Sequence, residues 1–195
     1  MTLDTRSLIL EQAEFLIRTR GYSAFSYADL AEHAGVTKAS VHYHFPTKEE
    51  LIVVLVREYM ERFVATLARI RAEPKGVRAR LRAYAQLFLA GFEKGMLPLC
   101  GALSAERAAL PESMRPQVQD FFRIHLDWLT GLLEEAPAEP RPRQAPAQAA
   151  LLLLSTLEGG TFVGWALADK APVLAAFEAA LDNLDISDPQ QPKES

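Results

Sequence analysis

Residues 26–50 read Ser-Tyr-Ala-Asp-Leu-Ala-Glu-His-Ala-Gly-Val-Thr-Lys-Ala-Ser-Val-His-Tyr-His-Phe-Pro-Thr-Lys-Glu-Glu. This stretch predicts two short helices separated by a turn, followed by the start of a third helix. Ser26, with Asp29 three residues later, is an acidic form of the capping box that begins a helix. Gly35 permits the positive φ that a sharp turn requires, and Thr37 is placed to cap the next helix. The pattern is that of a helix-turn-helix.

The helical pattern continues on both sides of this stretch. Upstream, apolar residues recur at spacings of three and four over 5–20, and Gly21 stands where a C-terminal cap is expected. Downstream, Thr47 and Glu50 form a capping box that opens a long helix reaching about Ala72. Residues 1–46 are therefore expected to form a three-helix unit.

The remainder of the chain also predicts helices, because apolar residues seldom alternate as they do in strands. Further helices are expected over about 77–94, 99–109, 111–133, 144–169 and 172–184. The Pro- and Ala-rich segment 134–146 is interpreted as a loop, and the polar end of the chain as a tail. We expect an all-α fold of about nine helices, with residues 47–195 forming a helical body.

Composition places the chain among soluble globular proteins. It has 195 residues, of which 49% are hydrophobic and 24% charged, and a net charge of −4. The single cysteine, Cys100, forms no internal disulfide, and the first residues lack the apolar run of a signal peptide, so we expect a cytoplasmic protein. The apolar stretch 145–168 is long enough to span a membrane, but Glu158 and neighbouring polar residues favour a buried or interface helix, with no membrane partner.

Several side chains near the turn suit contact with DNA, although the net charge of the chain does not indicate nucleic acid. Thr37, Lys38 and Ser40 offer short hydroxyls and a cation to base edges or phosphates. Tyr43 and His44 can donate to the phosphate backbone, although Tyr43 is also open to interpretation as a core residue. Lys48 lies in the first turn of its helix, where free backbone amides attract an anion.

Taken together, Gly21 to Ser26, Gly35-Val36, Lys38 to Phe45 and Lys48 to Leu51 resemble the TetR family of bacterial transcriptional repressors. The resemblance implies that residues 1–46 form a DNA-binding domain whose third helix enters the major groove. It also implies that residues 47–195 form an all-helical domain that dimerises and binds a small-molecule effector. His42 departs from the family, which usually has an aromatic residue at that position, so base preference there is not carried over.

The residues expected to contact double-stranded DNA are Ser26, Tyr27, Thr37, Lys38, Ser40, His42, Tyr43, His44 and Lys48. His42 and His44 lie two residues apart on a helix and so do not share a face, which argues against a metal site. We expect neither a metal nor an organic cofactor.

The helical body is rich in aromatic residues, each of which is also compatible with an ordinary core position. As a set with a few polar groups, they suit a cavity for an apolar or aromatic ligand. The residues predicted to line it are Tyr84, Phe88, Phe92, Cys100, Leu103, Phe121, Phe122, His125, Trp128, Phe162 and Trp165.

Cys100 has two interpretations. The sequence around it resembles a region of TetR-family members that sense electrophiles or oxidants, and a cysteine near a helix N-terminus can be reactive. The other interpretation, a small buried hydrophobic residue, is favoured because the chain has no second cysteine to resolve an oxidised one. A cysteine-dependent enzyme that uses Cys100 with His125 is a further alternative, but it leaves the helix-turn-helix unexplained.

The last two helices are predicted to form the interface of a homodimer, because small residues at helical spacing let backbones approach. The residues assigned to it are Leu151, Leu154, Thr161, Gly164, Ala168, Phe177 and Leu181. Two-fold symmetry then predicts a palindromic operator with half-sites roughly 34 Å apart. The favoured function is a ligand-responsive repressor that is not an enzyme. The alternative is a helical protein-interaction module without a DNA function.

Overall fold

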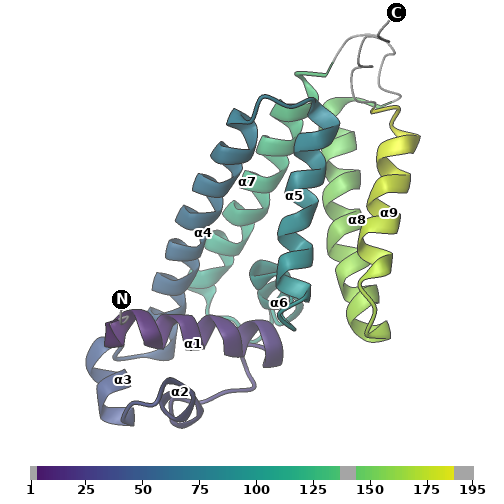
Figure 1. The fold of residues 1–195 in the computed structure, drawn as a ribbon. Helices are drawn as coiled ribbons and strands as arrows, with labels where there is room; N and C mark the ends of the chain where they lie inside the picture. Colours follow the sequence, from purple (N-terminus) through teal and green to yellow (C-terminus); the bar gives the residue numbers. More distant parts are fainter. Residues whose placement is uncertain (1–3, 137–143, 187–195) are drawn as a thin grey trace, which may run out of the picture. The chain divides into compact units, whose positions relative to one another are not determined.

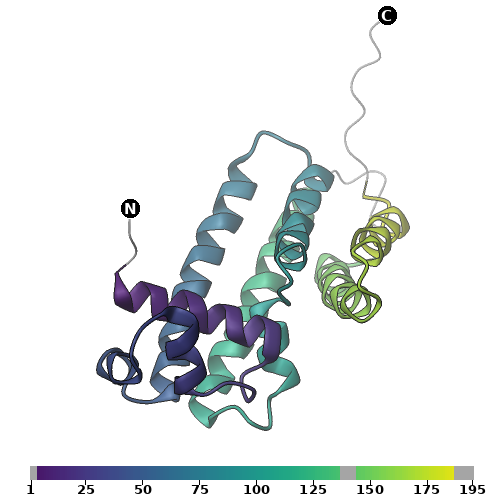
Figure 2. The same ribbon diagram turned by 60° about the horizontal axis from the view of Figure 1, so that its bottom comes forward.

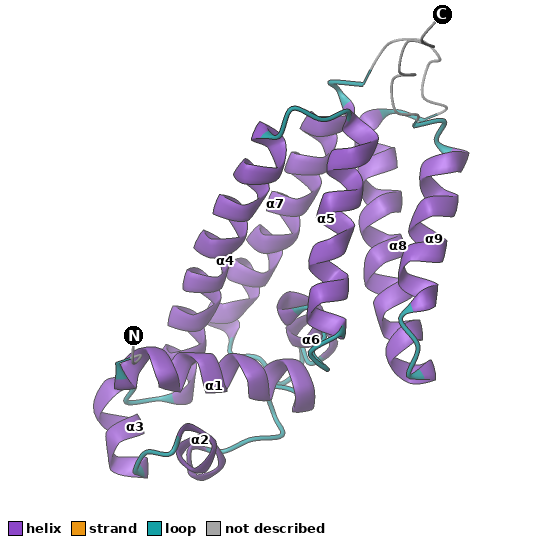
Figure 3. Ribbon diagram, in the orientation of Figure 1, coloured by secondary structure: helices purple, strands orange, loops and turns teal. Residues whose placement is uncertain are grey.

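The computed structural model describes residues 4–136 and 144–186, and the described residues form helices and connecting loops without a strand (Figures 1 and 3). Nine α-helices and one 3₁₀ turn make up these segments, which confirms the predicted all-α fold. The helices are α1 (Thr5–Arg20), α2 (Tyr27–Ala34), α3 (Lys38–His44), α4 (Lys48–Ala72), α5 (Val77–Phe92), α6 (Leu99–Ala105), α7 (Arg115–Leu133), α8 (Pro146–Leu167) and α9 (Ala171–Asn183). Most of the predicted loop 134–146, and the tail from residue 187, lie outside the described residues.

Two compact units share the chain. The first combines Met1–Phe63 with Gly95–Phe122, and the second combines Val64–Lys94 with Arg123–Ser195. Helices α4 and α7 contribute residues to both units. The functional boundary after residue 46 stays a prediction, because these units reflect packing within the chain and not which residues contact DNA.

The short-range caps of the first unit form as predicted. The Ser26 hydroxyl accepts a hydrogen bond from the Asp29 backbone N–H, and the Asp29 carboxylate accepts one from Ser26 N at 2.7 Å. Gly35 ends α2 with a φ of 65°, and Thr37 Oγ1 accepts from Ser40 N at 3.1 Å at the start of α3. These local bonds set the angle between α2 and α3.

The segment between α6 and α7 differs from the prediction. Helix α6 ends at Ala105, and the expected continuous helix from Pro111 begins instead as a 3₁₀ turn over Glu112–Met114 before α7. A residue that precedes proline is disfavoured in helical conformation, which keeps Leu110 out of a helix that continues through Pro111.

In the second unit, helices α8 and α9 lie side by side and antiparallel (Figures 1 and 2). Glycines of α8 permit the close approach. A Cβ on Gly160 would lie 3.2 Å from the Val173 Cα, and one on Gly164 would lie 2.6 Å from the Asp169 carbonyl oxygen. These contacts place the glycine side of α8 against α9 and the loop between the two helices.

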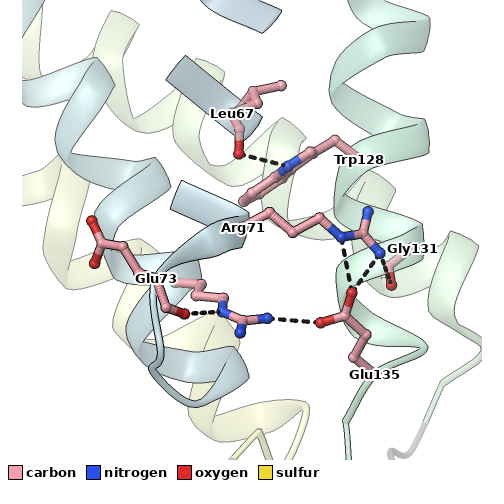
Figure 4. A network of polar contacts seen from close by, with 7 residues as sticks. Leu67, Arg71, Glu73, Trp128, Gly131 and Glu135 are labelled. Atoms are coloured by element: carbon pink, nitrogen blue, oxygen red, sulfur yellow. Dashed lines mark hydrogen bonds and ion pairs between the residues drawn. The ribbon is translucent and has the colours of Figure 1, made fainter. Parts of the chain in front are cut away.

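Polar contacts close one end of the second unit (Figure 4). Arg71 at the end of α4 donates to Glu135 and to the Gly131 carbonyl, while Arg80 of α5 donates to the other Glu135 oxygen at 2.7 Å. The Trp128 indole N–H donates to the Leu67 carbonyl at 3.2 Å. These bonds link the end of α7 to α4 and α5.

By length and composition alone, α8 is the one helix within 4–136 and 144–186 that is apolar enough to cross a membrane. Its Leu153, Leu154 and Leu157 are buried inside the chain, whereas Leu151, Val163 and Leu167 are exposed.

Candidate nucleic-acid interface and effector site

Helix α3 has one buried side and one exposed side. Val41 is buried in the first unit, as is Phe45 at the end of the helix. On the other side, Lys38 and His42 are exposed, and Tyr43 has 83% of its surface exposed. The interpretation of Tyr43 as a core residue is therefore wrong, and its ring is available to a partner.

Tyr27 anchors the end of α3. The ring is buried, and the hydroxyl donates to the Phe45 carbonyl at 2.9 Å, while burial raises the Tyr27 pKa far above its usual value. The His42 ring lies edge-on to the Tyr27 ring, with centroids 4.8 Å apart. The expected contact of Tyr27 with DNA stays a prediction, and the structure gives its hydroxyl a partner inside the chain.

The ammonium group of Lys48 holds the loop between α1 and α2. It donates to the Tyr22 carbonyl at 2.6 Å and to the Phe25 carbonyl at 2.5 Å. It also lies 4.5 Å from the centre of the Tyr22 ring and 3.9 Å from that of Phe25, which adds cation–π attraction. Burial lowers the pKa of Lys48. The predicted phosphate contact therefore competes with bonds that Lys48 already makes.

Glu106, at the end of α6, holds the same loop and was not found from the sequence. Its carboxylate accepts from the Ser23 N–H at 2.9 Å. Burial acts to raise the pKa of Glu106, but the hydrogen bonds from Ser23 lower it overall. Gly21 has a φ of +98°, and a Cβ there would lie 2.2 Å from Glu106 Oε1. Gly21 is thus required for its backbone conformation, and a side chain there would displace the Glu106 carboxylate.

Replacing Lys48 by methionine is expected to lower the free energy of unfolding by about 1–3 kcal/mol, because two loop carbonyls lose a charged donor. DNA binding should weaken for all sequences alike, since the loop positions the reading helix. Urea denaturation and a DNA titration measure the two effects. Lys38→Met, at an exposed position on α3, is the control with unchanged stability. Weaker DNA binding with unchanged stability in Lys48→Met would show that Lys48 acts on phosphate alone.

The other predicted DNA contacts lie on or near the exposed side of the helix-turn-helix. Ser26 and Thr37 are exposed, and each also caps a helix. Ser40 and His44 are half-buried, and the His44 ring lies edge-on to the Tyr43 ring. Their contacts with DNA stay predictions.

Four of the predicted pocket residues cluster in the interior of the second unit. Tyr84 of α5 is fully buried, and its ring stacks on Trp128 with centroids 5.3 Å apart. The Tyr84 hydroxyl forms a hydrogen bond with His125 Nδ1, and the Phe88 ring lies edge-on to both side chains. Burial lowers the His125 pKa to about 3, so the imidazole is neutral at physiological pH. We call Tyr84, Phe88, His125 and Trp128 the aromatic cluster.

The predicted pocket residues of the first unit are buried or half-buried. Cys100 and Leu103 of α6 are fully buried, and Phe121 lies beside Tyr59 and Phe63, with ring centroids 5.6 and 5.0 Å away. Phe122 is half-buried next to Phe121. The burial of Cys100 favours its interpretation as a small core residue.

The remaining predicted pocket residues are Phe162 and Trp165 of α8 and Phe92 of α5. Phe162 and Trp165 are 39% and 38% exposed, so neither is a core residue. The Trp165 ring meets Phe92 of α5 edge-on, with centroids 6.3 Å apart. Phe162 and Trp165 are therefore accessible to solvent.

The predicted dimer interface needs correction. Five of its residues, Leu154, Thr161, Gly164, Phe177 and Leu181, are buried within the chain and offer no surface to a second copy. The spacing of these residues correctly predicts that they share one side of a helix, but this side of α8 packs against α9 and α5. Leu151 and Ala168 are exposed. Exposed residues of the two helices that remain available to a second copy include Leu151, Leu152, Ser155, Gly159 and Val163 of α8 with Ala175, Ala176 and Ala179 of α9.

The geometry agrees with that of known proteins. Residues 9–55 match the family model "Bacterial regulatory proteins, tetR family". The fold matches the crystal structure of a TetR-family transcriptional regulator from Agrobacterium tumefaciens with a TM-score of 0.86 and 30% identity, covering 92% of this chain and 97% of that chain.

Curated relatives extend the similarity. The transcriptional regulator CymR of Pseudomonas putida is 32% identical over 91 residues, a match that spans 45% of each protein and thus less than half of that relative. The nucleoid occlusion factor SlmA of a Marinomonas strain is 27% identical over 159 residues, or 80% of each. Together with the exposed helix α3, these matches assign the chain to the TetR family of bacterial DNA-binding transcriptional regulators.

Proposed function

We propose that this protein is a homodimeric repressor that binds a palindromic operator and is released by a small molecule bound in its helical body. The observation that carries the proposal is helix α3, which is anchored by Val41 and Phe45 and presents Lys38, His42 and Tyr43 to solvent. An exposed tyrosine on a firmly held, seven-residue helix is suited to a fixed partner surface such as the major groove.

The two loop contacts support this role. Lys48 and Glu106 hold the segment between α1 and α2 from two elements of the first unit. A helix positioned in this way enters the groove with little loss of conformational freedom. Lys38 and the hydroxyls of Thr37 and Ser40 then contact phosphates or base edges, and Tyr43 contacts the backbone or an apolar base surface.

The second copy is proposed to pack on the exposed face of α8 and α9. Leu152 and Val163 provide apolar area, while Gly159 and Ala175 let the backbones approach closely. Pairing of this face with itself about a two-fold axis gives a four-helix interface. It also sets two reading helices at the spacing of successive major grooves.

Replacing Val163 by arginine is expected to convert the dimer into monomer, because a charge at the centre of this face is left buried and unpaired. Val163 is 52% exposed in the chain, so the folded protomer tolerates the change. Val64→Arg is the matched control, since Val64 on α4 is 45% exposed and lies outside this face. Analytical ultracentrifugation measures the result. A Val163→Arg protein that stays dimeric would place the interface elsewhere.

The effector is proposed to be a small molecule with an apolar or aromatic body, bound without a covalent bond. Accessible aromatic side chains of α8, of which Trp165 meets Phe92 of α5, supply apolar surface for it, and the buried Cys100 argues against an electrophile. Helix α4 begins at Lys48, which holds the α1–α2 loop, and ends at Ala72 in the second unit. Ligand binding shifts the population of α4 positions, and the two reading helices then no longer match the operator.

An electrophoretic mobility assay with the DNA upstream of the gene tests the function. The dimer should retard this DNA at low salt, with affinity that falls steeply as salt increases. In a reporter strain, deletion of the gene should raise expression from the same DNA. A folded dimer that fails to retard this DNA at low salt would refute the proposal.

A further inference from the structure

Glu158 is the unusual residue of α8. It lies within an apolar helix, and its Oε2 atom is buried without a hydrogen-bond partner among the described residues. Burial raises the pKa of this carboxyl to about 7. An ionised carboxylate in such a place is unfavourable unless a positive group pairs with it.

The neighbours of Glu158 along the helix are aromatic and accessible. Phe162 and Trp165 follow it by four and seven residues, so the three side chains share one side of α8. Both rings are more than a third exposed, and Trp165 also meets Phe92 of α5. Gly164 allows this approach, because a Cβ there would lie 3.3 Å from the Phe92 ring. We call Phe92, Glu158, Phe162 and Trp165 the α8 flank.

The charged residues of α5 and α9, the helices packed against α8 in this unit, are already in ion pairs, and Arg80 of α5 pairs with Glu135. Lys170 pairs with Glu93 at 2.5 Å, and Arg82 pairs with Glu178 at 2.7 Å. Arg78 pairs with Glu178 and with Asp182. His125 of α7 is neutral because burial lowers its pKa to about 3. Burial alone raises the pKa of Glu158, and no charged neighbour contributes to the shift.

A largely buried carboxylate on the same side of a helix as exposed aromatic rings is a combination suited to an organic cation. The faces of Trp and Phe rings attract ammonium groups, while the carboxylate supplies the opposite charge. From these contacts we propose that the α8 flank binds a lipophilic organic cation, such as an alkylammonium compound, with Glu158 as its counter-ion. This inference rests on the proposed function, because it names the chemical class of the effector.

A pair of probes that differ only in charge tests the site. Benzyltrimethylammonium carries a permanent positive charge, and neopentylbenzene is its neutral isostere. The cation should bind to the purified protein, free of DNA, at least about tenfold more tightly than the isostere. The wild-type affinity for the cation should also rise about tenfold between pH 6 and pH 8, because only the ionised carboxylate pairs with it and the Glu158 pKa is about 7. The probe itself does not titrate. Trp165 fluorescence and calorimetry measure binding.

Variants at position 158 separate the effect of the Glu158 charge from the effect of its side-chain shape. Glu158→Gln keeps the shape and should lose both the preference for the cation and the dependence on pH. Glu158→Asp should retain the dependence on pH even if it binds more weakly. Glu134→Gln, at an exposed position at the end of α7, should behave as wild type. Equal binding of the two probes, or unchanged cation binding in a folded Glu158→Gln protein, would overturn the inference.

Failure of the site and failure of the proposed function give different results. If a neutral aromatic compound releases operator DNA while the cation does not bind, the cation site is refuted and the ligand-responsive function stands. If the cation binds in a Glu158-dependent manner without affecting DNA binding, the site is supported and the proposed release mechanism is refuted.

Discussion

Replacing Tyr43 by alanine is expected to weaken operator binding by roughly 5- to 150-fold, which corresponds to about 1–3 kcal/mol for a side chain that contacts DNA. Tyr43 has 83% of its surface exposed, so its removal takes little from the interior of the first unit. Substitutions of this kind change stability by no more than about 0.5 kcal/mol. The melting temperature should therefore stay close to that of wild type while the DNA affinity falls.

Two variants define what Tyr43 does. Tyr43→Phe keeps the ring and removes the hydroxyl, so it separates a hydrogen bond to phosphate from an apolar contact. Phe15→Ala removes an exposed ring from α1 and should leave DNA affinity unchanged. Fluorescence anisotropy with labelled operator measures all three proteins. Wild-type affinity in a folded Tyr43→Ala protein would contradict the assignment of α3 as the helix that contacts the operator.

Tyr84→Ala should have the largest effect on stability, a loss of about 3–5 kcal/mol in the free energy of unfolding. Tyr84 is fully buried, stacks on Trp128 and forms a hydrogen bond with His125. Its removal leaves a cavity in the aromatic cluster and takes away the partner of a buried imidazole nitrogen. Urea denaturation of the variant and of wild type measures the difference.

Tyr84→Phe separates the two contributions. It keeps the stacked ring and removes only the hydroxyl, so we expect a loss of about 1–3 kcal/mol from the unsatisfied His125 nitrogen. Similar losses in the two variants would assign the stability to the hydrogen bond instead of the packing. Wild-type stability in Tyr84→Ala would mean that the cluster does not form a packed core.

The parts of the fold that the sequence predicts correctly depend on neighbouring residues. Ser26 with Asp29, Gly35, and Thr37 with Ser40 form caps over three or four residues, and such local bonds are readable from residue type and spacing. The bounds of α1 to α4 followed from the same signals. These features place the helix-turn-helix without knowledge of the remaining chain.

Features that depend on distant residues were not predictable in this way. Glu106 reaches the N–H of Ser23 across 83 residues of sequence, and no short pattern relates the two. Lys48 carries the charge expected of a phosphate contact, but its neighbours in space are the carbonyls of Tyr22 and Phe25. The type of each side chain is readable from the sequence, whereas the fold determines which partner it meets.

The dimer surface shows the same limit. Apolar spacing on α8 correctly predicts a helix, and Thr161 and Gly164 lie on one of its sides. The spacing does not reveal that this side packs within the chain, where a Cβ on Gly164 would meet the Asp169 carbonyl. Because α8 is apolar around most of its circumference, only the fold distinguishes the inner side from the outer one.

Hydroxyl-radical footprinting of the upstream DNA by the purified dimer tests whether α3 reads a two-fold symmetric operator. We expect two protected patches related by two-fold symmetry, with centres about one helical turn apart, and weaker protection of both patches by Tyr43→Ala at a protein concentration that just saturates the site with wild type. Absence of protection at low salt with a folded dimer, or an unchanged footprint in Tyr43→Ala, would contradict this expectation.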